Sequence, residues 1–311
     1  MNTPDIVFIG LGEAGQAFAG QLACAARGYD RKQDAAKRAE FDANGVAWAS
    51  SNAEAVADAP LIVSLVTADQ APLAAAETAR SIAPGALFCD LNSVAPDTKR
   101  AAAKAIEAAG GRYVDVAVMA PVHPQRLKVP MLVSGPHAEA GSAALAALGF
   151  QTRIVGSAIG DASAIKMIRS VMVKGIEALS AECALAAHAA GVEAEVLASL
   201  DKSWKEQSWA ERFDYNLDRM LIHGTRRAAE MEEVVKTLDG LGTGSQMTRG
   251  TVVRQRAIGA IGQGAPDGLQ AKVDLVTPHL RSIVTSAEAG ISGDENATQP
   301  RETPAFAGVT K

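Results

Sequence analysis

Short apolar runs alternate with helical stretches over the first half of the chain. Four runs rich in Val, Ile and Leu predict buried strands, at residues 5–9, 61–66, 86–91 and 113–118. Alanine-rich stretches with helical periodicity lie between them, for example at residues 98–109. Alternation of strand and helix is typical of a mostly parallel sheet with helices on both faces. Two further runs, at residues 131–134 and 152–155, are expected to extend that sheet.

After about Gly156 the strand pattern stops and the spacing of apolar residues becomes helical. From Asp161 onward apolar side chains recur at steps of three and four positions, which places them on one helix face. The residues at these steps are Ile165, Ile168, Met172, Ile176, Leu179 and Cys183. Further helices are expected over residues 193–205, 209–229 and 231–238, with others through Val284. The second half is therefore predicted to be all-α.

These patterns divide the chain into three parts. Residues 1–157 are predicted to form an α/β domain with a doubly wound sheet, and residues 158–288 an all-α domain for substrate binding and dimerisation. From about Ala289 the chain is polar, contains Pro and Gly and has no apolar period, so residues 289–311 are expected to be a disordered tail. A chain of 311 residues fits two compact domains.

Composition and charge narrow the class of protein. With 48% hydrophobic and 21% charged residues the chain has an ordinary globular composition, and its net charge of −5 provides no general attraction to nucleic acid or acidic lipid. No apolar run approaches the length of a membrane span, and the N-terminus lacks the basic segment of a signal peptide, so we expect a cytoplasmic protein without membrane or nucleic-acid partners. Cys24, Cys89 and Cys183 are far apart in apolar stretches; we expect them to pack as small hydrophobes and expect no metal site.

A glycine-rich turn directly follows the first predicted strand. The segment GLGEAG has the spacing G-x-G-x-x-G, and a helical pattern continues after it. Gly10 permits the tight turn, Gly12 lets the backbone approach a pyrophosphate, and Gly15 allows helix and strand to pack closely. This context predicts a Rossmann-type dinucleotide-binding domain. The loop residues expected at the cofactor are Gly10, Leu11, Gly12, Glu13, Ala14 and Gly15.

The adenosine end of the cofactor is expected at Asp30, which stands 20 residues after Gly10. A carboxylate there hydrogen-bonds the ribose hydroxyls and repels a 2′-phosphate, so it favours NAD. Arg31 beside it can pair with that phosphate, which favours NADP. We expect NAD or NADP as the cofactor, with NAD slightly favoured. Val66 and Thr67, which follow the 61–66 run, are also expected to contact it.

Four segments carry a family resemblance by their order along the chain. They are IGLGEAG at residues 9–15, DLNSVAPDTKR at 90–100, DVAVMAP at 115–121 and GDASAIKMIRS at 160–170. Together they resemble the fingerprint loop, the segment after the fifth strand, the D-A-P-V-S-G-G segment and the lysine helix of the 3-hydroxyacid and 6-phosphogluconate dehydrogenase superfamily. GEAG at residues 12–15 and RRAAEMEE at 226–233 are similar to a bacterial subgroup of it with a distinct helical C-terminal domain.

The resemblance implies roles for several residues. Lys166 matches the lysine that exchanges a proton with the substrate hydroxyl while hydride passes between the adjacent carbon and the nicotinamide. Ser93 matches the substrate-binding serine and Asn92 the neighbouring asparagine of the sugar-acid enzymes. Ser170 stands where the family has a substrate-orienting asparagine, and Lys174 follows on the same predicted helix face, so both are expected to line the cleft.

Two departures from the family pattern bear on the substrate. Val173 and Arg169 replace the glutamate and histidine of 6-phosphogluconate dehydrogenases, which disfavours their decarboxylation. Residues 119–121, Met-Ala-Pro, replace Ser-Gly-Gly, and proline has no N–H to offer a substrate carboxylate. This departure also favours a larger or less polar substrate. His123, with Gln125 and Arg126 nearby, is expected to restore a polar contact.

Three functions remain open at this point. The first is an NAD(P)-dependent dehydrogenase or reductase that acts on the CH–OH group of a hydroxyacid or related alcohol. The second is an imine reductase, since such enzymes share the two-domain plan, although a cationic Lys166 suits an iminium substrate poorly. The third is a non-catalytic dinucleotide-binding regulatory protein. The resemblance also implies a homodimer formed through the helical domain.

Overall fold

The computed structural model describes residues 6–203 and 206–279. The chain divides into two compact units between Val173 and Lys174. The proposed tail at 289–311 lies outside the described residues. The domain bounds 1–157 and 158–288 stay predictions.

The first unit contains, in its described part, an eight-stranded sheet with the order β3-β2-β1-β4-β5-β6-β7-β8. The strands are β1 Ile6–Ile9, β2 Ala26–Tyr29, β3 Val46–Trp48, β4 Leu61–Ser64, β5 Leu87–Asp90, β6 Arg112–Val118, β7 Pro130–Ser134 and β8 Gln151–Gly156. Neighbouring strands run parallel except β6 and β7, which are antiparallel. The prediction of a mostly parallel sheet is confirmed. The chain reverses its direction of sheet growth between β1 and β4, where open α/β sheets bind ligands.

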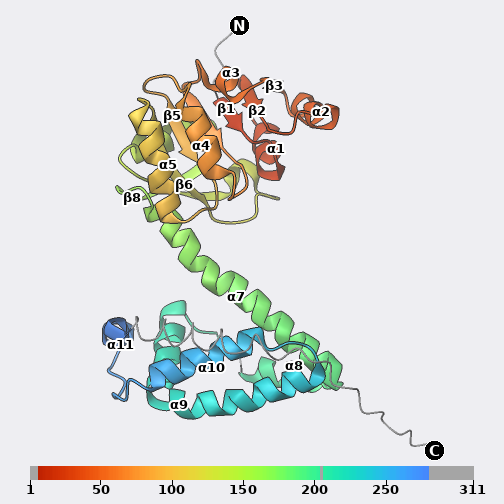
Figure 1. Ribbon diagram of the computed structural model, residues 1–311, viewed down its shortest axis with the longest axis vertical. Helices are drawn as coiled ribbons and strands as arrows, with labels where there is room; N and C mark the ends of the chain where they lie inside the picture. The colour runs from red at the N-terminus through yellow and green to blue at the C-terminus, as the bar shows by residue number, and fades with distance from the viewer. Residues whose placement is uncertain (1–5, 204–205, 280–311) are drawn as a thin grey trace, which may run out of the picture. The chain divides into compact units, whose positions relative to one another are not determined.

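Helices cover both faces of this sheet. They are α1 Glu13–Ala19, α2 Ala35–Ala43, α3 Asn52–Val56, α4 Ala71–Ala79, α5 Pro96–Ala108 and α6 Ala138–Ala147, with the short 3-10 helix η1 Arg126–Lys128. In Figure 1, α4 and α5 lie side by side on one face of the sheet. Ile6 and Phe8 of β1 belong to one buried cluster, while Val7 and Ile9 belong to another. Because both faces are buried, the strand is apolar without alternation.

The helical region after the sheet confirms the predicted change of class. Its helices are α7 Asp161–Ala190, α8 Glu193–Ser203, α9 Trp209–Leu241, α10 Gln246–Gly259 and α11 Leu269–Val276, followed by the 3-10 helix η2 Thr277–His279. The prediction of two helices over 209–229 and 231–238 is wrong, since α9 is continuous. No proline or glycine lies between residues 225 and 239 to interrupt it. A capping box of Ser208 and Glu211 begins α9, and Gly242, with a φ of 70°, ends it.

Within the second unit, α9 and α10 pack along each other (Figure 1). Their backbones meet at Gly224 and Gly259: a Cβ on Gly224 would lie 2.3 Å from the carbonyl oxygen of Gln255. The buried Glu182 of α7 accepts hydrogen bonds from the backbone N–H groups of Met247 and Thr248, the first turn of α10. A carboxylate at that end of the helix is favourable because it meets the positive end of the helix dipole.

The three cysteines differ from one another in burial. Cys89 in β5 is fully buried, and burial raises the pKa of its thiol to about 12. Cys24 is half-buried. Cys183 is exposed, so the expectation that all three pack in a core is wrong for this one. Cys183 lies on α7, where the apolar period continues over a face that the single chain does not cover.

Candidate functional site

The glycine loop between β1 and α1 is shaped by close backbone packing at two positions and by open space at the third. Gly10 has a φ of +89°, and a Cβ there would lie 2.6 Å from the carbonyl oxygen of Leu65. A Cβ on Gly15 would lie 2.9 Å from the carbonyl oxygen of Gly10. A Cβ on Gly12 would meet no protein atom within 4 Å. The backbone at Gly12 is thus open to a ligand, as the phosphate loop requires.

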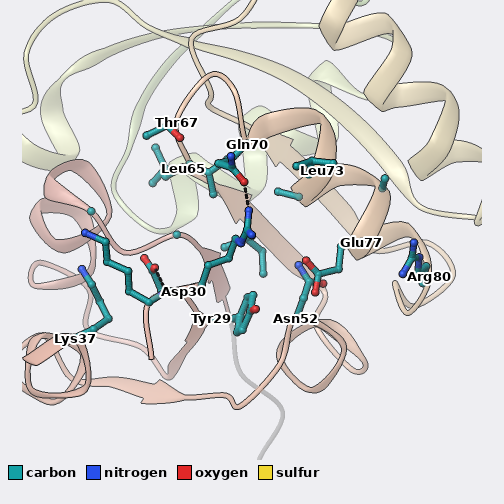
Figure 2. Close-up of a pocket in the computed structure, with 18 residues that line it drawn as sticks. Tyr29, Asp30, Lys37, Asn52, Leu65, Thr67, Gln70, Leu73, Glu77 and Arg80 are labelled. Atoms are coloured by element: carbon teal, nitrogen blue, oxygen red, sulfur yellow. Dashed lines mark hydrogen bonds between the residues drawn. The ribbon is translucent and has the colours of Figure 1, made fainter. Parts of the chain in front are cut away.

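A pocket of about 770 Å³ adjoins this loop at the switch between β1 and β4. Its size lies within the usual range of cofactor sites. Figure 2 shows Tyr29 and Asp30 on one side of it, facing Gln70 and Leu73 on the other. The pocket is lined by Gly10, Gly12, Asp30, Arg31, Val66 and Thr67 of the predicted set. Leu11, which is fully buried, and Glu13, Ala14 and Gly15 belong to the loop and to α1 but do not line this pocket.

The Asp30 carboxylate is tied to the glycine loop. Its Oδ2 accepts a hydrogen bond from the backbone N–H of Leu11 (3.0 Å), and its Oδ1 accepts one from the N–H of Lys32 (2.9 Å). Lys37 of α2 donates to the carbonyl oxygen of Leu11 (3.2 Å) and pairs with Glu40. The negative charge of Asp30 is therefore fixed beside the loop at the end of β2. Each carboxylate oxygen can still accept another hydrogen bond.

The opposite wall of the pocket comes from the segment after β4 and from α4. The Arg31 guanidinium donates a hydrogen bond to the Gln70 side chain, drawn as a dashed line in Figure 2. Val66 and Thr67 lie on the connecting segment, and the N–H of Val66 donates to Asn92 Oδ1 (2.7 Å). The Asn92 amide also donates to Ser64 Oγ (2.9 Å), and the residue is only 4% exposed. Asn92 therefore joins the ends of β4 and β5, and its contact with substrate stays a prediction.

The first unit brings Lys166 and Ser93 together. Lys166 lies in the second turn of α7, and Ser93 lies three residues after the end of β5. The Lys166 Nζ donates a hydrogen bond of 2.6 Å to Ser93 Oγ. Lys166 is half-buried and Ser93 is exposed, so solvent and small molecules can reach the pair. An amine and a hydroxyl in contact can hold and pass a proton.

The remaining predicted substrate residues lie in three different surroundings. Ser170 donates its hydroxyl to the carbonyl oxygen of Lys166 (3.0 Å), one turn back on α7. Lys174 is exposed and begins the second unit. His123 lines a separate pocket of about 430 Å³ together with Gln21 and the η1 segment. The substrate roles of Ser170, Lys174 and His123 stay predictions.

Two further findings concern metal binding and membrane-spanning helices. Among residues 6–203 and 206–279, no group of three or more His, Cys, Asp or Glu side chains is placed to bind a metal ion. In the same part of the chain, no helix combines the length and the apolar character needed to cross a membrane.

Comparison with known proteins places both units in described families. Residues 5–148 match the NAD binding domain of 6-phosphogluconate dehydrogenase. Residues 187–258 match a domain of unknown function, DUF1932. A conserved hypothetical protein from Sinorhizobium meliloti is 38% identical, over 88% of this chain and 96% of its own, with a TM-score of 0.55. The chain belongs to the 6-phosphogluconate and 3-hydroxyacid dehydrogenase superfamily.

Other proteins are similar to this chain over most of its length or over part of it. A conserved protein of unknown function, described as structurally similar to 3-hydroxyacid dehydrogenases, is 26% identical over 91% of this chain and 98% of its own, with a TM-score of 0.53. An uncharacterised 28.5 kDa protein of Methanothermus fervidus is 27% identical over 183 residues, 58% of this chain and 68% of its own. The structure of an imine reductase from Aspergillus terreus is similar over 88% of this chain and 99% of the reductase chain, with a TM-score of 0.68. At 19% identity its likeness concerns the fold alone.

Several residues of this NAD(P)-binding domain were not anticipated from the sequence. Tyr29 of β2, Lys37 of α2, Gln70 at the N-cap of α4 and Glu77 of α4 line the pocket beside the glycine loop. They share no spacing along the sequence, so no sequence pattern selects them as a group. The pocket assembles them because β2 and β4 are both neighbours of β1.

Proposed function

We propose that this protein is an NAD(P)-dependent oxidoreductase that transfers hydride between the nicotinamide and a hydroxyacid-like substrate or a related alcohol or carbonyl compound. The observation that carries the proposal is the 2.6 Å hydrogen bond between Lys166 Nζ and Ser93 Oγ in a chain that also has an NAD(P)-binding domain. A proton-transfer group and a hydroxyl-binding group are what oxidation of an alcohol requires besides the hydride acceptor. A bound nicotinamide would supply that acceptor.

Lys166 is the proposed proton-transfer residue. In oxidation, its neutral amine accepts the proton of the substrate hydroxyl as the carbonyl forms. In reduction, its ammonium returns that proton to the carbonyl oxygen. Ser93 holds the amine by accepting its hydrogen bond and, through its own O–H, can donate to the substrate oxygen. The two side chains would thus orient one oxygen atom of the substrate between them.

Arg169 is the proposed partner of the substrate acid group. It follows Lys166 by three positions on α7, and its Nη1 lies 3.5 Å from the carbonyl oxygen of Met119. Met119 opens the segment in which Pro121 offers no N–H. A guanidinium has five N–H donors and binds a carboxylate through two of them. Arg169 can therefore replace the donors that this segment lacks, which favours a substrate that bears a carboxylate.

NAD remains the favoured cofactor in this proposal. The Asp30 carboxylate is fixed at the end of β2 by the N–H groups of Leu11 and Lys32, where a 2′-phosphate would meet its charge. Arg31 is turned toward Gln70, although its guanidinium can be redirected at the cost of one exposed hydrogen bond. The opposite charges of Asp30 and Arg31 are therefore expected to determine whether NAD or NADP binds more tightly.

A paired substrate screen tests the proposed function. The full chain would be assayed by the absorbance of the reduced nicotinamide, with NAD(H) and NADP(H), on hydroxyacids, on the same alcohols without the acid group, and on a cyclic imine. We expect turnover of hydroxyacids and weaker turnover of the matched alcohols. Reduction of the imine alone would replace the proposal with imine reduction. Cofactor binding without turnover of any substrate would support a regulatory protein instead.

A homodimer is the proposed assembly. The second unit has a small buried cluster around Leu221, Ile258 and Val276, and large apolar side chains remain exposed on its helices. Leu179 and Leu185 on α7 are 48% and 58% exposed. A second copy of the chain could bury this surface, and symmetric pairing is the commonest way in which chains do so.

A further inference from the structure

A fully buried lysine, Lys99, contacts two carboxylates that are hydrogen-bonded to the segments carrying Ser93 and Lys166. Lys99 of α5 is 0% exposed, and its Nζ donates to the carbonyl oxygen of Asp90 (2.6 Å) and to Asp90 Oδ1 (2.9 Å). The same Nζ lies 3.5 Å from Asp115 Oδ1. Asp90 and Asp115 occupy paired positions of β5 and β6. One ammonium thus bridges two carboxylates, and the superfamily roles assigned above use none of the three groups.

The Asp90 carboxylate controls the path of the chain toward Ser93. Its Oδ1 accepts a hydrogen bond from the N–H of Asn92 (2.9 Å), and its Oδ2 accepts one from the Tyr113 hydroxyl (2.6 Å). The Asn92 side chain is itself held by β4, so the backbone is fixed as far as the residue that precedes Ser93. Ser93 therefore leaves the sheet in a direction that Asp90 determines.

The Asp115 carboxylate controls the start of α7. Its Oδ2 accepts hydrogen bonds from the N–H of Gly160, from the N–H and hydroxyl of Ser163, and from the Ser134 hydroxyl, each at 3.1 Å. Ser134 in turn accepts the N–H of Ala162 (2.9 Å). A carboxylate at the first turn of a long helix is favourable with respect to the helix dipole. Lys166 follows Ser163 by three positions, one turn along the same face.

Both carboxylates depend on Lys99. Asp115 Oδ1 makes no hydrogen bond, so the nearby ammonium is its main compensation among the described groups. A buried carboxylate without a cation is strongly disfavoured, and the ammonium alone would be equally so. Lys99 therefore links the strand end before Ser93 to the helix start before Lys166 through the two carboxylates.

We propose that Asp115, bridged through Lys99 to Asp90, is a positioning residue that sets the Lys166 amine against the Ser93 hydroxyl. The consequence for catalysis rests on the proposed function, in which Lys166 transfers the proton. The positioning itself is a property of the protein without substrate. It can therefore be measured without any knowledge of the substrate.

Competitive labelling of lysines provides that measurement. The folded full chain is treated with a trace of acetic anhydride, and the labelling of Lys166 is expressed relative to the exposed Lys104 by mass spectrometry of peptides. The variants are Asp115→Asn, which removes the charge and keeps the shape, and Ser163→Ala, which removes only one hydroxyl. Asp58→Asn is the matched control, because Asp58 is exposed and pairs with Arg27 in another part of the fold.

We expect the ratio for Lys166 to rise about fivefold in Asp115→Asn and by less in Ser163→Ala, as the hydrogen bond to Ser93 is lost. Asp58→Asn should leave it unchanged. A ratio that stays at the wild-type value in both variants overturns the proposal, even if their thermal stability falls, since lost stability alone indicates only a structural role. If Asp115→Asn does not fold, Ser163→Ala decides by itself.

Measurements of turnover distinguish a failure of the positioning role of Asp115 from a failure of the catalytic role of Lys166. With a substrate identified, Asp115→Asn should lower kcat about tenfold or more while the dissociation constant of the reduced cofactor is unchanged. If Lys166→Ala retains wild-type turnover, the catalytic assignment of Lys166 fails. The labelling ratio then still decides whether Asp115 positions the amine.

Discussion

Lys166 and Ser93 are joined by a 2.6 Å hydrogen bond from Nζ to Oγ although 73 positions separate them in the sequence. The lysine comes from the start of a long helix and the serine from the segment after β5. Both belong to the first unit, which also carries the glycine loop. The two groups that the superfamily resemblance selected are therefore in contact within one compact unit.

Replacement of Lys166 should remove chemistry and leave cofactor binding intact. Loss of a positioned acid–base group costs about 10²–10⁴-fold in rate, so Lys166→Ala should lower kcat by at least about two orders of magnitude. Lys166→Arg should be nearly as damaging, because an arginine does not release its proton at working pH. Steady-state kinetics and titration of the reduced cofactor measure the two effects.

Lys174→Ala is the control for this prediction. Lys174 is an exposed lysine two turns further along the same helix, and its removal should cost much less. A Lys166→Ala protein that turns over at a rate near wild type would contradict the assignment. The general base would then have to be sought among His123, Lys174 and the residues around Ser93.

Two glycines of the phosphate loop should respond to substitution in opposite ways. Gly12→Val should abolish NAD(P)H binding and change the free energy of unfolding by less than about 0.5 kcal/mol, because a Cβ there meets no protein atom within 4 Å. Gly10→Ala should destabilise the fold by about 2 kcal/mol, because its φ is positive and its Cβ would lie 2.6 Å from the Leu65 oxygen. Cofactor fluorescence and denaturant unfolding measure these effects. Unchanged cofactor affinity in Gly12→Val would remove the dinucleotide site from residues 10–15.

The cofactor preference should be decided by Asp30 and Arg31. We expect NADH to bind more tightly than NADPH in the wild-type protein. Asp30→Asn removes the charge that opposes a 2′-phosphate and should shift the ratio of the two dissociation constants toward NADPH by about tenfold. Arg31→Ala should shift it in the other direction, since a phosphate loses its cation. Fluorescence titrations with both reduced cofactors test this, and tighter NADPH binding by the wild type would transfer the preference to Arg31.

The contact between α9 and α10 leaves no room for a side chain at Gly224. A Cβ there would lie 2.3 Å from the carbonyl oxygen of Gln255, so Gly224→Ala should lower the free energy of unfolding by about 1–3 kcal/mol. Gly240→Ala, on the same helix, meets no atom within 4 Å and should be neutral or stabilising by up to about 1 kcal/mol. Equal stability of the two variants in denaturant unfolding would contradict the close packing of α9 against α10 at Gly224.

The exposed apolar face of the second unit should bury itself in a homodimer. Light scattering of the purified chain at micromolar concentration should give twice the mass of the chain. Leu185→Glu, which places a charge on a side chain that is 58% exposed, should shift the equilibrium toward the monomer if this face is buried. A wild-type protein that is only monomeric at that concentration contradicts the proposal.

The local pattern of apolar residues and glycines was sufficient to predict the structural class of each half of the chain and the position of the phosphate loop. The runs at 5–9, 61–66, 86–91 and 113–118 coincide with β1, β4, β5 and β6, because strands buried on both faces need continuous apolar residues. β3 was not predicted: it has three residues, of which Ala47 is exposed, and so it carries little hydrophobic pattern. The break expected within α9 was wrong because a polar stretch without glycine or proline does not end a helix.

The sequence by itself determined the order of the elements, the glycine loop and the identity of Lys166 and Ser93 as candidates, since these depend on spacing and on matching motifs. Only the tertiary structure decided which side chains meet. It brought Asp30 to the N–H of Leu11 and gave both the oxygen and the nitrogen of the Asn92 amide a hydrogen-bond partner. It also placed His123 at a different pocket from the one that Asp30 lines. It also gathered Lys99, Asp90 and Asp115 at one buried point. Such contacts depend on which strands become neighbours and on the need to compensate buried charge, and neither is encoded in local spacing.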